Sequence, residues 1–182
     1  MTVRLEETNP EWEQLDLSGL SGPLLVVGPT DVGKTTFSRY LFKQLCKVFP
    51  RVAYLDGDPG QSTLGPPATM TLALGENGDD SFPPRGPMWR GFVGSVSPAG
   101  HMLLVLTCGA RLIGAARGAS VQATVYDTTG LVDPARGGIY LKLDQIDLFR
   151  PAVLFAIQRD QELKSLLLPP GQEILRVTFG FD

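Results

Sequence analysis

Two patterns of hydrophobic positions alternate along the chain. Short apolar runs at residues 23–28 and 52–55 are typical of parallel strands that are covered on both faces, and a further strand is predicted at 121–126. Between the first two runs, apolar side chains recur at helical spacing over residues 34–48. A strand, a helix and a second strand in this order predict a βαβ unit.

The same alternation continues beyond this unit. Further strands are predicted at 72–74, 89–95, 153–157 and 174–179, and helices at 98–117, 139–149 and 160–168. Because strands alternate with helices throughout, the sequence predicts an α/β protein, a three-layer sandwich around a mostly parallel sheet.

Two segments depart from the alternation. Residues 1–22 are polar apart from anchors such as Trp12 and Leu15, which predicts a peripheral N-terminal segment. Residues 75–87 contain almost no large apolar side chain and several Gly and Pro, which predicts a mobile loop. We expect residues 1–182 to form a single domain, since this length suits one core of ordinary size.

Composition and charge narrow the class of protein. Hydrophobic residues make up 43% of the 182 positions and charged residues 19%, so the chain is too apolar to be disordered. A net charge of −3 excludes a uniformly basic coat for nucleic acid but allows a local basic groove. Two cysteines and one histidine are too few for a disulfide framework or a histidine-based metal site. No apolar run approaches the ~20 residues of a membrane helix, so we expect no membrane partner. The low cysteine count favours a cytoplasmic location, and we expect a monomer.

A phosphate-binding motif follows the first predicted strand. Residues 28–35 are Gly-Pro-Thr-Asp-Val-Gly-Lys-Thr, the P-loop pattern of two spaced glycines, a lysine and a hydroxyl residue. The strand before it and the amphipathic helix after it are the context that this motif requires, so a chance match is the weaker interpretation. The sequence therefore predicts a P-loop NTPase fold.

Each part of the motif has a physical task. The glycines let main-chain amides face the phosphates at the positive end of the following helix. Lys34 is expected to reach the β- and γ-phosphates, and the Thr35 hydroxyl to be a Mg²⁺ ligand. The residues predicted to contact ATP here are Gly28, Pro29, Thr30, Asp31, Val32, Gly33, Lys34, Thr35 and Thr36.

Two carboxylates follow the second predicted strand, at the sheet edge where open α/β proteins bind ligands. Asp56 and Asp58 allow a division of labour, in which one holds the water shell of a metal ion and the other accepts a proton from an attacking hydroxyl. The amide of Gln61 is suited to orient a water or a hydroxyl. The alternative is that one of the two carboxylates only caps the turn before Pro59.

The segment Asp127-Thr128-Thr129-Gly130 closes a further predicted strand at the same edge. Hydroxyls and a glycine beside a γ-phosphate would clamp it, whereas a tight strand-to-loop turn would explain the same residues. From the residues alone, both interpretations stay open.

Taken in order, these motifs resemble the polynucleotide 5′-hydroxyl kinase family. That family includes the RNA kinase of the eukaryotic pre-mRNA 3′-end cleavage machinery and its nucleolar, rRNA-processing relatives. The P-loop is shared with many families, whereas Asp-x-Asp-x-Gly-Gln followed by Pro-Pro and Thr-Thr-Gly is much more specific. The matching segments are 28–35, 52–62, 66–67, 92–98, 127–132, 141–142 and 156–163, within about residues 23–168.

The resemblance implies transfer of the γ-phosphate of ATP to the 5′-hydroxyl end of RNA or DNA, with single strands favoured. It associates Asp56, Asp58 and Gln61 with metal binding and activation of the hydroxyl, and we favour Asp58 as the base. The family's clasp falls on Thr128-Thr129-Gly130. In full, the catalytic prediction is Lys34, Asp56 and Asp58, the metal prediction Thr35, Asp56 and Gln61, and the substrate prediction Gln61, Thr128, Thr129 and Gly130.

The chain departs from the family pattern in two places. Leu131 stands where the family often has an aromatic residue after its clasp. No convincing Arg-x-x-x-Arg lid is found, so Arg136, Arg150 or Arg159 is a candidate to supply transition-state charge instead. The likeness also places Arg159 near the nucleotide base, where an exposed helix start is the alternative. We expect a kinase core without the flanking domains of the eukaryotic members.

Two further groups of residues have open interpretations. One interpretation is a groove for nucleic acid lined by Trp89, Arg90, Phe92, Arg111 and Arg117, whereas aromatic residues of a predicted strand can also belong to the core. Lys142 either contacts phosphate or lies on a solvated helix face.

Two other classes of function are alternatives to the kinase. A dimeric regulatory or partitioning ATPase also places Asp-x-Asp after its second strand, but it typically has an extra lysine early in the loop, and residues 29–32 contain none. The third class is a scaffold that holds ATP as a structural ligand in RNA processing.

Overall fold

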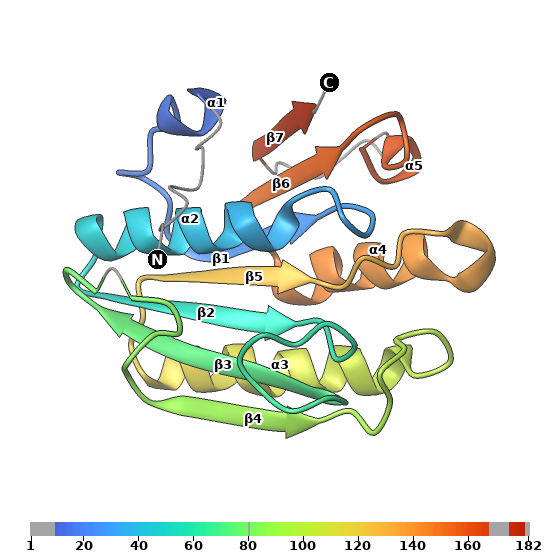
Figure 1. Ribbon diagram of the computed structural model, residues 1–182, viewed down its shortest axis with the longest axis horizontal. Helices are drawn as coiled ribbons and strands as arrows, with labels where there is room; N and C mark the ends of the chain where they lie inside the picture. Colours follow the sequence, from blue (N-terminus) through green and yellow to red (C-terminus); the bar gives the residue numbers. More distant parts are fainter. Residues whose placement is uncertain (1–9, 80, 168–174, 181–182) are drawn as a thin grey trace, which may run out of the picture.

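The computed structural model describes residues 10–79, 81–167 and 175–180, and these form an α/β structure around one sheet (Figure 1). Seven strands of the described chain lie in the order β4-β3-β2-β5-β1-β6-β7. Their bounds are β1 Gly22–Val27, β2 Arg51–Gly57, β3 Thr69–Glu76, β4 Met88–Phe92, β5 Ala123–Thr128, β6 Val153–Gln158 and β7 Leu175–Gly180.

The sheet is parallel except at β3. Strands β2, β5, β1, β6 and β7 pair in parallel, whereas β3 runs antiparallel to both β2 and β4. The carboxyl ends of β1, β2 and β5 therefore meet at one edge, on the right in Figure 1. The site residues predicted from the sequence follow these three strands and lie at this edge.

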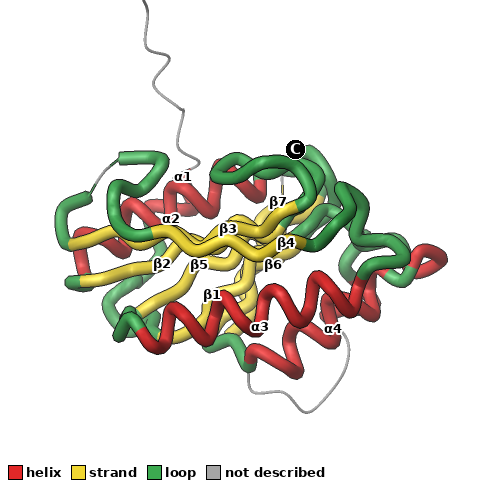
Figure 2. Tube along the Cα trace, turned by 90° about the horizontal axis from the view of Figure 1, so that it is seen from below, coloured by secondary structure: helices red, strands yellow, loops and turns green. Residues whose placement is uncertain are grey.

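Helices cover both faces of the sheet, which confirms the predicted three layers (Figure 2). Alternate strand residues face opposite ways, so Leu24 and Val26 pack with α2 while Leu25 and Val27 pack with α3 and α4. The helices are α1 Pro10–Glu13, α2 Lys34–Val48, α3 Met102–Gly118, α4 Gly138–Phe149 and α5 Lys164–Leu167, with a 3₁₀ turn, η1, at Pro134–Arg136. None of these helices of the described chain is long and apolar enough to span a membrane.

The N-terminal segment is anchored through Trp12, as predicted. Its ring is 5% exposed and packs against Phe37 and Tyr40, with ring centroids 5.2 Å and 5.5 Å apart. Residues 1–9 of that segment lie outside the described residues.

Strand β3 extends into the segment predicted as a mobile loop, 75–87. A Cβ atom on Gly75 would lie 2.5 Å from the Phe42 ring, so this glycine allows close packing of β3 on α2. Further along, the Phe82 ring packs against Tyr54 with centroids 5.0 Å apart. The mobility of the loop stays a prediction.

Other boundaries shift by a few residues. Strand β5 includes Asp127 and Thr128, because they pair in register with Asp56 and Gly57 of β2. The helix predicted at 98–117 begins at Met102, the strand predicted at 89–95 ends at Phe92, and the helix predicted at 160–168 shortens to Lys164–Leu167. Residues 168 and 174 of the predicted elements lie outside the described residues.

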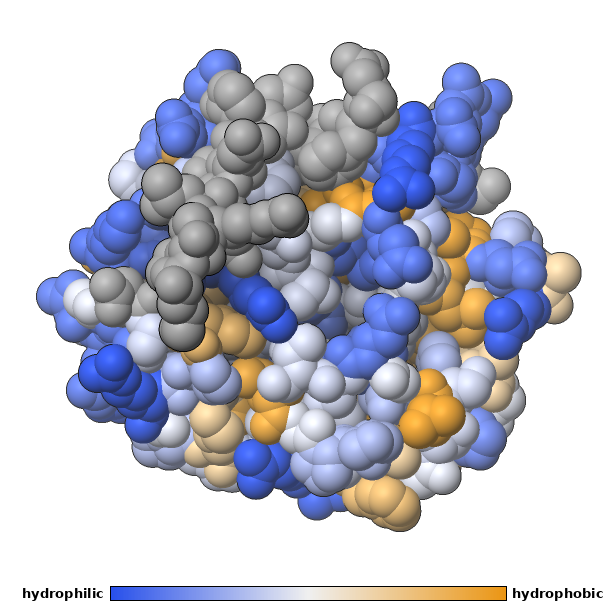
Figure 3. Space-filling model, viewed as in Figure 1, coloured by the Kyte–Doolittle hydropathy of each residue, from blue (hydrophilic) through white to orange (hydrophobic). Residues whose placement is uncertain are grey.

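The surface is mixed. On the face seen in Figure 3, hydrophobic residues form separate patches among hydrophilic ones. Trp89 and Phe92 on the edge strand β4 are 36% and 77% exposed, so their assignment to the core is wrong. A groove for nucleic acid at these residues stays a prediction.

Candidate active site

The P-loop is held by the strands around it. Gly28 follows β1, and a Cβ atom there would lie 2.2 Å from the main-chain oxygen of Ile157 in β6. Asp31 and Gly33 adopt left-handed conformations, with φ of 61° and 88°. The Arg159 guanidinium donates to the main-chain oxygen of Asp31 at 2.6 Å. The backbone therefore curls into the turn that a P-loop needs before α2 begins at Lys34.

Lys34 lies over this turn. It is 8% exposed, and its Nζ donates to the main-chain oxygen of Pro29 at 2.5 Å. Burial lowers the pKa of Lys34, while the charges of Asp127, Asp58 and Asp31 oppose that shift. The ammonium is thus held at the loop, where a phosphate anion would compensate its buried charge.

Asp127, at the end of β5, is the carboxylate next to the P-loop hydroxyl. Its Oδ2 accepts hydrogen bonds from Thr35 Oγ1 at 2.7 Å and from the Tyr54 hydroxyl at 3.0 Å. Burial raises the pKa of Asp127 to about 6, against the hydrogen bonds from Thr35 and Tyr54. The sequence pattern at Asp127 predicts only a phosphate clamp or a turn. An aspartate that closes a strand beside the P-loop strand is nevertheless a known signal for a magnesium partner.

The surroundings of Asp127 suit a hydrated magnesium ion. Its second oxygen, Oδ1, is buried and has no hydrogen-bond partner among the residues described. An unpaired buried carboxylate oxygen beside a threonine hydroxyl fits an ion that takes oxygen ligands and keeps several waters. Thr35 and Asp127 are therefore the residues that would hold Mg²⁺.

Asp56 has a different environment. Its Oδ2 accepts from the main-chain amides of Thr63 and Leu64, at 2.6 Å and 2.9 Å, and from Ser62 Oγ at 3.0 Å. Burial raises the pKa of Asp56, and these hydrogen bonds oppose the shift. Asp56 thus fixes the loop after β2. The geometry favours Asp127 for the metal, and a metal task for Asp56 stays a prediction.

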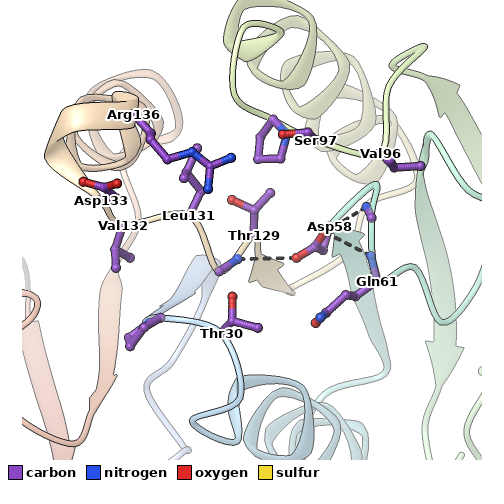
Figure 4. A pocket seen from close by; sticks show the side chains of 14 residues that line it. Thr30, Asp58, Gln61, Val96, Ser97, Thr129, Leu131, Val132, Asp133 and Arg136 are labelled. Carbon is purple, nitrogen blue, oxygen red and sulfur yellow. Dashed lines mark hydrogen bonds between the residues drawn. The ribbon is translucent and has the colours of Figure 1, made fainter.

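Asp58 lies two residues further, at the mouth of a pocket. Its Oδ1 accepts from the amides of Gly60 and Gln61 at 2.9 Å and 3.1 Å, and its Oδ2 from the amide of Gly130 at 3.4 Å (Figure 4). These two amides belong to the turn at Pro59, so Asp58 is the carboxylate that caps this turn, and they orient it from one side. Because the contact to Gly130 is long, Oδ2 keeps capacity to accept a further proton.

The pocket has a volume of about 650 Å³ and opens between four loops at the sheet edge. It is lined by Pro29, Thr30, Asp58, Gly60, Gln61, Val96, Ser97, Pro98, Thr129, Gly130, Leu131, Val132, Asp133 and Arg136. The P-loop forms one wall, and residues 96–98 lie on the opposite side from it in Figure 4. A phosphate donor and an acceptor can therefore meet beside Asp58.

A buried lysine holds the predicted clasp, residues 128–130, by hydrogen bonds. Lys142 Nζ donates to Thr128 Oγ1 at 2.9 Å, to Thr129 O at 2.7 Å and to Thr129 Oγ1 at 3.2 Å. Lys142 is fully buried, and burial lowers its pKa to about 7. The interpretation of Lys142 as part of a solvated helix face is wrong, because α4 turns this residue toward the end of β5.

Gly130 brings this clasp against the P-loop. A Cβ atom there would lie 2.4 Å from Thr30 Oγ1 and 2.9 Å from the Thr30 amide nitrogen. A larger residue would push the two loops apart. The chain bends at Gly130 after β5, and Thr129 lines the pocket, while the clasp and the tight turn both stay predictions.

The sequence matches a known family over most of its length. The family described as mRNA cleavage and polyadenylation factor CLP1 P-loop matches residues 28–174. The chain belongs to this family. The match spans the P-loop, both Asp-x-Asp carboxylates and the clasp, so the resemblance stated from these motifs is confirmed.

Relatives in the CLP1 P-loop family carry kinase names. The chain is 32% identical over 146 residues to the polyribonucleotide 5′-hydroxyl-kinase of Methanocaldococcus jannaschii, covering 80% of this chain and 40% of that protein. It is 31% identical over 156 residues to the kinase of the same name from Pyrococcus horikoshii, covering 83% and 42%. The chain thus spans about two fifths of the length of these curated relatives.

A solved structure of the family has the same fold. A Clp1p–Pcf11p complex superimposes with a TM-score of 0.64 at 16% identity, covering 94% of this chain and 48% of that one. At this identity, the likeness supports the α/β P-loop fold alone.

The structure brings most predicted site residues of this CLP1-type domain to one edge. Gln61 lines the pocket and Thr36 is exposed in the first turn of α2, whereas Val32 is 4% exposed and packs in the core beneath the loop. Arg150 is not brought there, because it precedes β6 and lies at the opposite edge of the sheet. Arg159 contacts the P-loop, and its placement near a nucleotide base stays a prediction.

Proposed function

We propose that this chain carries the centre of an ATP-dependent polynucleotide 5′-hydroxyl kinase, which transfers the γ-phosphate of ATP to the 5′-hydroxyl end of RNA or DNA. The observation that carries the proposal is the position of Asp58, in a pocket shared by the P-loop and the clasp. An acceptor in that pocket would have a carboxylate on one side and the phosphate-binding turn on the other. The kinase names of the family relatives support the same conclusion.

The residues divide the reaction between them. Lys34 and the P-loop amides bind the phosphates, and Thr35 with Asp127 would hold Mg²⁺, whose charge neutralises the developing charge on the phosphates. Asp58 accepts the proton of the 5′-hydroxyl while the hydroxyl oxygen forms a bond to the γ-phosphorus. The bond between the γ-phosphorus and the oxygen that bridges it to the β-phosphorus breaks, and ADP leaves.

The test is a transfer assay with γ-labelled ATP and matched 5′-hydroxyl ribo- and deoxyribo-oligonucleotides. Label should appear on the acceptor, and an oligonucleotide that already has a 5′-phosphate should remain unlabelled. Absence of label on every 5′-hydroxyl acceptor would contradict the kinase. ATP hydrolysis coupled to dimerisation would then favour the regulatory ATPase, and ATP that is retained without turnover would favour the scaffold.

We also propose single-stranded 5′ ends as the substrate and a cytoplasmic monomer as the working form. Cys46 and Cys108 are free and buried, which suits a reducing compartment. Native mass measurement and comparison of single- with double-stranded acceptors test these points.

A further inference from the structure

Arg136 is the cation that lines the candidate pocket. It closes the 3₁₀ turn η1, and in Figure 4 its guanidinium extends into the space above Thr129 and Leu131. The other charged residues of the lining are Asp58 and Asp133. One positive group therefore stands in a pocket that otherwise offers carboxylates, hydroxyls, amides and apolar side chains.

The backbone that supports Arg136 is fixed, although its side chain is exposed. Asp133 caps the turn by accepting from the Ala135 amide at 2.9 Å, and its main-chain oxygen accepts from Gly138 at 2.7 Å. The Gly137 amide closes the turn on Pro134 O at 3.0 Å. The closed turn thus fixes the backbone from which the Arg136 side chain extends to the pocket.

The guanidinium has no partner in the described chain. No hydrogen bond or ion pair joins Arg136 to a described residue, and the two nearby carboxylates accept from main-chain amides instead. A free guanidinium offers a planar fork of donors, which matches the oxygens of a phosphate. A pocket with this feature suits an anionic ligand.

Two anions could use this cation, and their positions differ. The phosphates of ATP belong on the P-loop wall, where Lys34 already stands. Arg136 comes instead from the turn after the clasp, and in Figure 4 it lies on the far side of Thr129 from Thr30 of the P-loop. The first anionic group that a polynucleotide carries beyond its 5′-hydroxyl is the phosphate on the 3′ side of the terminal nucleoside.

We propose that Arg136 binds this 3′-side phosphate and thereby selects acceptors that carry one over free nucleosides. The inference rests on the proposed kinase function and deepens it. Apolar side chains across the pocket, Val96 and Pro98, offer contact area for the terminal nucleoside itself. The acceptor would then be held by its phosphate, its nucleoside and its 5′-hydroxyl at once.

The experiment compares acceptors and variants. Wild type, Arg136→Ala and Arg136→Lys are assayed with adenosine, adenosine 3′-monophosphate and a 5′-hydroxyl hexaribonucleotide. Lys47→Ala is the control, because Lys47 is exposed in the last turn of α2, at the end of the helix away from the P-loop. Equilibrium binding of the same acceptors is measured in parallel.

Wild type should use the two phosphate-bearing acceptors at least about tenfold better than adenosine. Arg136→Ala should lower kcat/KM for those two by about 10- to 100-fold, mainly through KM, and change adenosine by less than about twofold. Arg136→Lys should recover part of the loss, since it keeps the charge without the fork.

Three results would overturn the inference. An equal loss with every acceptor, or a loss of ATP hydrolysis without acceptor, would assign Arg136 to ATP. No loss in Arg136→Ala would assign it no contact. Transfer by no acceptor in wild type would contradict the kinase itself, and equal binding of adenosine 3′-monophosphate by wild type and Arg136→Ala would then also reject the contact.

Discussion

At the residue scale, the site separates three aspartates by what their oxygens accept. Asp56 accepts from loop amides through Oδ2, Asp127 accepts from a threonine and a tyrosine hydroxyl through Oδ2, and Asp58 accepts from two amides through Oδ1 and from a third, at 3.4 Å, through Oδ2. Of these three carboxylates, Asp58 is the one that lines the pocket. Its place in the pocket, and not the number of its hydrogen bonds, therefore distinguishes the candidate base.

Replacing Asp58 tests this distinction. Asp58→Asn keeps the shape and an acceptor oxygen but cannot take a proton, so kcat should fall by about 10²- to 10⁴-fold while ATP binding persists. Asp133→Asn is the control, because Asp133 lines the same pocket but caps η1. Phosphate transfer and nucleotide binding are measured for both, and a rate for Asp58→Asn within twofold of wild type would reject Asp58 as the base.

Lys142 predicts a pH-dependent stability. Its pKa is about 7 in the folded chain and returns toward 10.5 on unfolding, so the unfolded chain binds more protons between these values. The contribution of Lys142 to the free energy of unfolding therefore grows as the pH rises from 7, by at most ~1.4 kcal/mol per pH unit.

The measurement compares wild type with Lys142→Met by urea unfolding at pH 7, 8 and 9. The stability difference should shift toward wild type with increasing pH. Lys47→Met, at an exposed position in α2, should show no such trend. A difference that is constant with pH would indicate that Lys142 has an ordinary pKa.

At the element scale, the helical spacing of α4 indicated that a residue is buried although its type suggested exposure. Ile139, Lys142, Ile146 and Phe149 follow one another at helical spacing and are all buried. The period therefore placed a lysine on the inward face, where a charge was not expected. The acceptors that satisfy it come from β5, so only packing reveals why it is tolerated there.

In strand β3, a glycine packs closely at a position where the composition predicted a loop. Gly75→Ala should lower the free energy of unfolding by about 1–3 kcal/mol, because its Cβ would meet the Phe42 ring. Gly114→Ala, with nothing within 4 Å of the added Cβ, should instead raise it by about 0.5–1 kcal/mol. Urea unfolding compares the two, and a neutral Gly75→Ala would place residue 75 outside a packed strand.

At the scale of the whole molecule, the parallel sheet assembles the site. The P-loop, the Asp58 loop and the clasp follow β1, β2 and β5, which are neighbours in the sheet although the clasp lies about 100 residues from the P-loop in sequence. Binding of a nucleotide would therefore tie three strand ends together and stabilise the entire domain.

Magnesium and ATP should raise the free energy of unfolding by about 2.7 kcal/mol at 100 times the dissociation constant. Lys34→Ala should lose most of this gain, because it removes the cation held at the P-loop. Lys47→Ala should retain the full gain. Thermal unfolding with and without ligand measures the effect, and an equal gain in Lys34→Ala would reject the predicted nucleotide site.

The amino-acid sequence alone determined the α/β class, the strand–P-loop–helix unit and the family, because these depend on residues that are adjacent in the chain. Tertiary structure decided what each aspartate contacts, since that depends on the register of β2 with β5 and on amides of distant loops. It also decided that Lys142 is buried and that Arg136, not Arg150, reaches the pocket. Contacts between remote segments leave no local pattern in the sequence. For this reason the motif could be predicted from the sequence, whereas the contacts of the three aspartates could not.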